Sequence, residues 1–349
     1  MDLSVMFFGA DDAGADTDHA ATYRDVLAVA QEADRLGLTA VWTPERHFQR
    51  VGQVFPSPPV LSAAIAATTE RIQVRAGSVV LPLHHPLRVA EDWAVVDNIS
   101  AGRVGLSVAT GWHSTDFVLA PGHYADRRER ALRDIPLLRR LWAGEEVEFT
   151  DGTGKPVAVR PQPRPHSPRL PIWITSSGNP ETWVTAGRLR TNVLAATIGQ
   201  TREELAEKIR RYRESFAAAP EQLGTTGRGT VTLMAHTYVG EDDAEAVRTA
   251  GAPLRRYLKS YVAQTAANRT DDGRAAALTP EQTDQLAEFA LRRYLKWGGL
   301  LGSPDRCRRV LADLRDLGCD EVACFVDFGL GRDEVLAGLH RLAALRKDV

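Results

Sequence analysis

The chain has 349 residues, of which 44% are hydrophobic and 25% charged, a globular composition long enough for two domains or one large α/β barrel. The formal net charge of −2 argues against binding to nucleic acid or to a membrane surface. No apolar run approaches the roughly 20 residues of a membrane span. Cys307, Cys319 and Cys324 lack metal-binding spacing, so we expect buried thiols. These features, with an acidic amino end unlike a signal peptide, predict a cytoplasmic protein.

Short apolar runs alternate with segments of helical periodicity along the whole chain. The predicted strands cover 3–8, 39–43, 72–81, 103–109, 171–176, 190–197, 231–239 and 320–327. The predicted helices cover 22–37, 57–70, 86–100, 126–143, 180–188, 201–218, 241–263 and 332–347. Continuous apolar strands are typical of parallel sheets that are buried on both faces. The succession of β-then-α units predicts an α/β fold, a (β/α)8 TIM barrel made by residues 1–349 as a single domain.

Two insertions lengthen this barrel beyond the usual size of about 250 residues. Residues 144–170 predict a hairpin and a proline-rich arm, whereas residues 245–300 add a polar stretch near 268–274 and a second helix at about 280–296. Both are candidates for a mobile lid or an oligomer contact. No GxGxxG motif follows the first strand, which argues against an open dinucleotide-binding sheet.

Three adjacent ionisable residues, Glu45, Arg46 and His47, follow the second predicted strand. Functional residues of a (β/α)8 barrel lie where the strands end and the βα loops begin. The alternative is a purely structural ion pair between Glu45 and Arg46, because charged clusters also occur without function. Neighbouring residues seldom pair well across one backbone, so we expect each side chain to have its own partner.

Gly77 and Ser78 interrupt the third predicted strand, where a glycine suggests a bulge or a close approach of the backbone to a ligand. His84 and His85 follow. Adjacent side chains point in different directions and no third ligand stands at a familiar spacing, so we expect no metal site.

The loop after the fourth strand also has the composition of a binding site. Thr110 and Gly111 permit a close approach to the backbone, and Trp112 with His113 supplies a flat wall and a titratable group. His236, within the seventh predicted strand, is a further titratable candidate.

Hydroxyl groups precede a predicted helix after the fifth strand, where Ser176, Ser177, Gly178 and Asn179 lead to Pro180. Hydroxyls and free amides at a helix start form an anion site, although a plain helix cap has the same appearance. The segment 302–307 (GSPDRC) also opens a helix, and the local chemistry does not choose between the two.

The sequence contains no evident nucleophile: there is no GxSxG motif and no cysteine in the pattern of a thiol enzyme. Paired carboxylates of the glycosidase type are missing as well, since Glu45 alone directly follows one of the middle strands. A mouth rich in glycine, hydroxyl groups, tryptophan and histidine predicts that a cofactor supplies the reactivity.

Four strings in barrel order resemble the bacterial luciferase-like flavin monooxygenases. They are VWTPERHF, VLPLHHPLRVAEDWAVVDNISAGRVGLSVATGWHSTDF, PIWITSSGNPETW and LLGSPDRC. The chain is most similar to the atypical, MupA-like FMN-dependent subgroup of natural-product gene clusters, in which GWHxxDFxLAPxxYxxRR and SSGNPET recur. The similarity extends from Val5 to Gly329.

The resemblance implies a barrel that binds reduced FMN and O2, with the flavin phosphate near Ser176, Ser177 and Gly178. It also implies a cis peptide bond between Gly77 and Ser78 beneath the flavin ring. We predict that the cofactor-binding residues are Gly77, Ser78, Ala109, Thr110, Gly111, Ser176, Ser177, Gly178 and Asn179.

The chain departs from luciferase itself at three positions of the expected site. Arg46 stands where luciferase has its first, catalytic loop histidine; Ala109 aligns with the reactive cysteine and Thr110 with the arginine after it. Light emission from an aldehyde is therefore not expected. Arg46 cannot be a base, because a guanidinium stays protonated. We predict His47 as the proton-transfer residue, with His113 and His236 second, and Arg46 as the holder of an anion.

The resulting hypothesis is an FMN-dependent monooxygenase of natural-product biosynthesis that hydroxylates, N-oxygenates or inserts oxygen into a small or carrier-protein-bound acyl or aminoacyl substrate. Its predicted partners are a separate flavin reductase, an acyl or peptidyl carrier protein and a second copy in a homodimer. The alternatives are hydride transfer with FMN or a deazaflavin, and a flavin-binding protein without catalysis.

Overall fold

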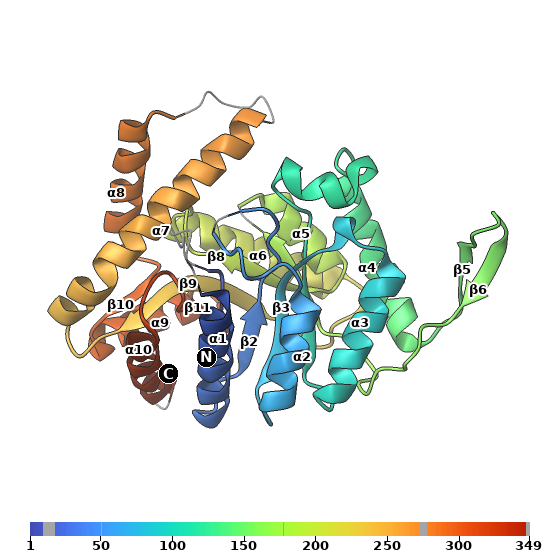
Figure 1. The fold of residues 1–349 in the computed structure, drawn as a ribbon, viewed down its shortest axis with the longest axis horizontal. Helices are drawn as coiled ribbons and strands as arrows, with labels where there is room; N and C mark the ends of the chain where they lie inside the picture. The colour runs from blue at the N-terminus through green and yellow to red at the C-terminus, as the bar shows by residue number, and fades with distance from the viewer. Residues whose placement is uncertain (10–17, 50, 177, 272–277, 347–349) are drawn as a thin grey trace.

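Eight parallel strands form a closed barrel (Figure 1). The computed structural model describes residues 1–9, 18–49, 51–176, 178–271 and 278–346. The strand order β1–β2–β3–β4–β7–β8–β9–β11 closes because β11 pairs with β1 and β8 pairs with β9. The barrel strands are β1 (Asp2–Met6), β2 (Ala40–Thr43), β3 (Gln73–Val80), β4 (Val104–Ala109), β7 (Ile172–Ser176), β8 (Asn192–Ala196), β9 (Val231–Val239) and β11 (Glu321–Phe325). The predicted (β/α)8 barrel is confirmed.

Helices pack around the outside of the barrel, and all of them except α9, of which only the start at 302–307 was predicted, overlap the predicted ranges. They are α1 (His19–Arg35), α2 (Pro58–Thr68), α3 (Pro86–Ile99), α4 (Arg127–Ala143), α5 (Pro180–Arg188), α6 (Arg202–Ala218), α9 (Pro304–Asp316) and α10 (Arg332–Leu345). Leu36 and Leu317 cap the carboxyl ends of α1 and α9, and Gly37 and Gly318 follow with φ of 75° and 97°.

The two insertions leave the barrel on different sides (Figure 1). The first contains the predicted hairpin, β5 (Val147–Thr150) paired antiparallel with β6 (Pro156–Val159). The second contains α7 (Asp243–Asp271) and α8 (Pro280–Lys296), which pack against each other. Helix α7 is longer than predicted, and part of the polar stretch at 268–274 lies outside the described residues. The short strand β10 (Leu300–Gly302), not predicted, pairs with the carboxyl end of β9.

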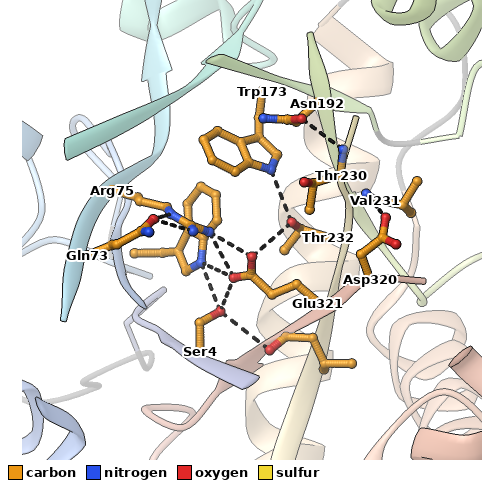
Figure 2. A network of polar contacts seen from close by, with 12 residues as sticks. Ser4, Gln73, Arg75, Trp173, Asn192, Thr230, Val231, Thr232, Asp320 and Glu321 are labelled. Carbon is orange, nitrogen blue, oxygen red and sulfur yellow. Dashed lines mark hydrogen bonds and ion pairs between the residues drawn. The ribbon is translucent and has the colours of Figure 1, made fainter. Parts of the chain in front are cut away.

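A network of polar side chains fills the barrel near the amino ends of its strands (Figure 2). The Arg75 guanidinium lies between the Gln73 amide oxygen and the Glu321 carboxylate, at 2.9 and 2.7 Å. Trp42 and Trp173 cover the pair, with their rings 4.8 and 4.5 Å from the Arg75 Cζ atom. Polar and aromatic side chains therefore fill the barrel interior at this end.

The remaining expectations about the scaffold concern its thiols and its helices. Cys307, Cys319 and Cys324 are buried free thiols, as predicted. Within the described ranges, no helix combines the length and the apolar character that a bilayer span requires.

Candidate active site

A cavity of about 240 Å³ opens at the carboxyl ends of the barrel strands. Every barrel strand, or the loop that follows it, contributes to the wall, and α7 and α8 cover one side. The lining residues are Met6, Phe8, Pro44, Glu45, Arg46, Gly77, Ser78, Val80, Ala109, Thr110, Gly111, Trp112, Thr175, Ser176, Ala196, Ile198, Met234, His236, Tyr257, Tyr261, Tyr294 and Phe325.

Eight of the predicted site residues meet in this wall. They are Arg46, Gly77, Ser78, Ala109, Thr110, Gly111, Ser176 and His236. His47 and His113 lie behind the wall rather than in it, and Gly178 and Asn179 follow Ser176 at the start of α5. Ser177 lies outside the described residues.

The Glu45 carboxylate is buried and accepts three hydrogen bonds. The donors are the Val80 amide at 2.6 Å, His84 Nε2 at 2.6 Å and His47 Nε2 at 2.9 Å. Burial raises the pKa of Glu45, but the bonds from His47, His84 and Val80 outweigh it and hold that pKa below 4.5. The structural Glu45–Arg46 pair is therefore wrong, and Glu45 orients two imidazoles instead.

The His84 and His85 side chains are both engaged in ways that explain the HH sequence without a metal. Burial lowers the pKa of His84, but the bond to Glu45 outweighs it and raises that pKa above 6.5. His85 Nδ1 accepts from the Leu87 amide and caps α3. Among the described residues, no group of three His, Cys, Asp or Glu side chains is arranged to hold a metal.

The Arg46 guanidinium lies on aromatic rings rather than on a carboxylate. Its Cζ atom is 3.7 Å from the Phe8 ring centroid and 5.2 Å from that of Trp112. Arg46 is 5% exposed, and its Nη1 has no hydrogen-bond partner in the described part of the chain. Burial lowers the pKa of Arg46 from its ordinary value. The side chain is thus a desolvated cation beside the cavity.

Asp116 lies close to these groups and was not singled out from the sequence. It is buried, and its Oδ1 atom has no hydrogen-bond partner among the described residues. Burial raises the pKa of Asp116 to about 6, although His47 and Arg46 oppose that rise. His113, from the same loop, is buried with its ring 4.0 Å from that of Trp112.

His236 lies in an aromatic cage deeper in the barrel. Tyr257 and Tyr294 approach its ring at centroid distances of 4.6 and 5.1 Å, and Phe325 and Phe328 at 5.1 and 5.4 Å. Burial lowers the pKa of His236 to about 3. The imidazole is therefore neutral at physiological pH and cannot act as a general acid in its cationic form.

A bulge in β3 brings backbone to the cavity floor. The register with β4 shifts between Gly77 and Val79, and the Gly77–Ser78 peptide bond is cis, as the resemblance implied. The Ser78 hydroxyl bonds that of Thr175, which also bonds Ser107 at 2.7 Å. The bulge predicted at Gly77 and Ser78 is therefore confirmed.

The two rival anion sites differ in what already occupies them. At the start of α9, the Ser303 amide donates to Asp243 Oδ1 at 2.7 Å, and the Ser303 hydroxyl caps Arg306. Asp243 thus fills that site and repels a second anion. At the start of α5, the buried Ser176 Oγ has no partner among the described residues. Open space also surrounds the position of a Cβ on Gly178.

The model of a family described as luciferase-like monooxygenase matches residues 1–321 of the chain. The chain belongs to the luciferase-like monooxygenase family. The predicted enzyme class, a flavin-dependent monooxygenase of this type, is confirmed. The narrower MupA-like assignment remains a prediction.

Relatives with known activities and solved structures agree with this membership. The oxygenase component of flavin-dependent trigonelline monooxygenase from Acinetobacter baylyi is 27% identical over 331 residues, 92% of this chain and 88% of the relative. Monooxygenase RslO1 from Streptomyces bottropensis has a TM-score of 0.79 at 23% identity, covering 99% of this chain and 98% of its own. The oxygenating constituent of 3,6-diketocamphane monooxygenase from Pseudomonas putida, in complex with FMN, has a TM-score of 0.76 at 18% identity, covering 98% and 96%. Other relatives are F420-dependent dehydrogenases.

The described residues of this luciferase-like enzyme fit FMN. A phosphate would give the Ser176 hydroxyl, which has no partner among the described residues, a hydrogen-bond acceptor beside the positive end of α5, whose Glu181 and Thr182 amides already donate to Asn179. The Gly77–Ser78 bulge and the Ala109–Gly111 segment leave backbone, rather than bulky side chains, facing the cavity. Reduced FMN, when bound, supplies the electrons that activate O2 for transfer of one oxygen atom.

Sequence reasoning missed the aromatic residues that cover this site. Tyr257 and Tyr261 stand four residues apart on α7, and Tyr294 comes from α8. The helical spacing of the first two was visible, but no local signal showed that these helices return over the barrel mouth.

Proposed function

We propose that this protein is the FMN-dependent oxygenase component of a two-component monooxygenase of natural-product biosynthesis, of the MupA-like kind. It acts as a single-domain enzyme, receives reduced FMN from a separate reductase, and oxygenates a small or carrier-protein-bound acyl or aminoacyl substrate. The observation that carries the proposal is the buried Ser176 hydroxyl at the end of β7, which has no partner among the described residues and follows Thr175, whose hydroxyl bonds Ser78 in the β3 bulge.

The side chains around the cavity divide the work. Ser176 and the start of α5 hold the phosphate, and the β3 bulge with Ala109, Thr110 and Gly111 supports the flavin ring. Tyr257, Tyr261 and Tyr294 exclude water, which protects the reactive cofactor from unproductive decay.

His47 is the group that we propose for proton transfer. Glu45 is an ionised acceptor, so His47 Nε2 carries a proton and the ring has a fixed orientation. His47 does not line the cavity itself, but its charge is felt by the neighbouring Asp116, whose pKa it lowers. His236, being neutral, contributes a hydrogen bond.

His47→Gln tests this role, because it keeps size and hydrogen bonding but removes the titratable proton. Loss of general acid–base catalysis lowers the rate by about 100- to 10,000-fold. The readout is a mass gain of one oxygen on candidate carrier-bound substrates, with hydrogen peroxide release measured in parallel. Normal turnover with a lowered melting temperature would show that the loop is structural.

The cofactor assignment is tested by anaerobic titration with reduced FMN, oxidised FMN and F420. The proposal expects reduced FMN to bind much more tightly than oxidised FMN. Equal affinity for the two redox states, or a preference for F420, would overturn it in favour of hydride transfer. A homodimer is also part of the proposal, and its test is the mass in solution.

A further inference from the structure

The buried arginines of the described chain differ in how their charge is satisfied. Arg75 pairs with Glu321, and Arg190 donates to the carbonyl oxygens of Phe216, Ala219 and Thr225. Arg46, at 5% exposure, makes no side-chain hydrogen bond or ion pair with any described residue. An isolated buried charge is costly unless it acquires a partner. Arg46 is therefore the buried arginine that has no charged or hydrogen-bonded counterpart among the described residues.

The acids nearest to Arg46 do not supply that counterpart. Asp327 accepts the Phe8 and Gly9 amides at 2.9 and 2.7 Å. Asp116 influences Arg46 electrostatically but forms no ion pair with it, and its own Oδ1 stays unbonded in the described structure. Among the described residues, no acid is left to pair with Arg46, which favours a ligand as its partner.

The surroundings of Arg46 define the chemistry of such a partner. The Phe8 ring covers one face of the guanidinium, which leaves the planar N–H edge for an acceptor. That edge matches a carboxylate, which accepts two parallel hydrogen bonds from it. The nearby cavity wall is apolar and aromatic, with Trp112, Tyr257 and Tyr261.

The aromatic wall also borders a further cavity. A second cavity of about 340 Å³ lies between α7 and α8 and shares Ile198, Tyr261 and Tyr294 with the first. Its other walls are largely apolar, formed by side chains that include Val262, Leu286, Phe289, Ala290 and Trp297. An apolar cavity therefore adjoins the cavity that Arg46 lines, with Ile198, Tyr261 and Tyr294 as their common wall.

We infer that the substrate is an amphipathic organic anion whose carboxylate binds Arg46 and whose aromatic or aliphatic body lies along the tyrosine wall toward the α7–α8 cavity. The inference rests on the proposed function in calling this ligand the substrate. The cofactor phosphate does not compete for Arg46, because strands β3 and β4 separate β2 from the Ser176 site on β7.

The test is a matched pair of probes, 2-naphthoate and 2-naphthamide, which share shape and differ in charge. Calorimetric titrations are run anaerobically, with and without reduced FMN. Wild type should bind naphthoate about 10- to 100-fold more tightly than naphthamide, the usual weight of hydrogen bonds to a charged group. Arg46→Met should remove this preference without weakening naphthamide, and Arg46→Lys should restore part of it.

Arg293→Met is the matched control, because Arg293 lines the second cavity but already donates to the Gln200 carbonyl oxygen. Its preference for naphthoate should equal that of wild type. Equal affinity for the two probes, undetectable naphthoate binding, or a preference lost in Arg293→Met and kept in Arg46→Met would each overturn the inference. So would a loss of reduced-FMN affinity in Arg46→Met that matches its loss of naphthoate, because the guanidinium would then serve the cofactor. Failure of wild type to bind reduced FMN overturns the proposed function alone, because naphthoate is also titrated without flavin.

Discussion

Two buried arginines, one at each end of the barrel, differ in whether the described chain supplies them with a partner. Arg75 at the closed end and Arg46 at the open end are both 5% exposed. Arg75 has Glu321 and Gln73 as partners, and the neighbouring Trp42 indole donates to Ser4 at 3.0 Å. At the open end, polar atoms of Arg46, Asp116, Ser176 and His236 have no partner among the described residues.

This difference separates a structural network from a binding site. Buried polar groups in folded proteins are normally hydrogen-bonded, so a cluster of unpaired ones needs an explanation. In the Arg75 network the chain supplies the partners itself, and these contacts fix the packing of the strands. At the open end, we propose that a cofactor phosphate and an anionic substrate supply the partners of Ser176 and Arg46.

The largest expected effect is on the free energy of unfolding, measured in two single variants in which Arg75 or Arg46 is replaced by methionine. Arg75→Met strands the Glu321 carboxylate without its cation and should lower the free energy of unfolding by about 3–5 kcal/mol. Arg46→Met removes an unpaired charge and should leave that free energy unchanged or higher. Urea denaturation measures both, and a large loss in Arg46→Met would abolish the contrast between the two ends.

Two serines at helix starts form the next pair. Ser303→Ala removes a helix cap and should cost about 0.5–2 kcal/mol of stability without changing reduced-FMN affinity. Ser176→Ala removes a hydroxyl that has no partner in the described protein, so stability should hold. Its reduced-FMN affinity should fall by about 10-fold, through the lost bond to a charged phosphate. The reverse result would move the phosphate to the 302–307 segment.

Asp116→Asn should stabilise the protein, in contrast to a change at the closed end. Because the folded pKa is raised from 3.8 to about 6, the carboxyl group favours the folded state at low pH and loses that contribution as the pH rises through 6. Thermal unfolding should therefore show a gain for Asp116→Asn at pH 8 and little difference at pH 4. A loss of stability at pH 8 would indicate a structural partner for Asp116.

The smallest effect concerns His84, which is the exposed end of the Glu45 cluster. Its pKa is raised above 6.5, so its bond to Glu45 contributes most below pH 6.5 and less as the pH rises through the folded pKa. The destabilisation by His84→Gln should accordingly be larger at pH 5.5 than at pH 8.5. In a Glu45→Gln background the pH dependence should disappear, and its persistence there would assign it to another group.

The sequence predicted the elements well because their signals are local. Helix stops at Gly37 and Gly318, proline at the start of α5 and apolar runs in the strands depend on neighbours along the chain. Barrel order then followed from the alternation of elements, and it placed Arg46, Gly77, Gly111 and Ser176 at one end. The extent of α7 and the strand β10 were not predicted, because packing between distant segments sets them.

By itself the sequence determined the barrel, the family and those residues of the mouth that follow the barrel strands directly, but not the tyrosines of α7 and α8. Only the tertiary structure decided what each side chain faces. Glu45 and Arg46 are neighbours in the chain, yet Glu45 turns to His47 and His84 while Arg46 turns to Phe8 and Trp112. The physical reason is that a charge takes its partners from residues brought near in space: Val80 and His84 lie more than 30 positions from Glu45, and Arg46 finds none in the described chain.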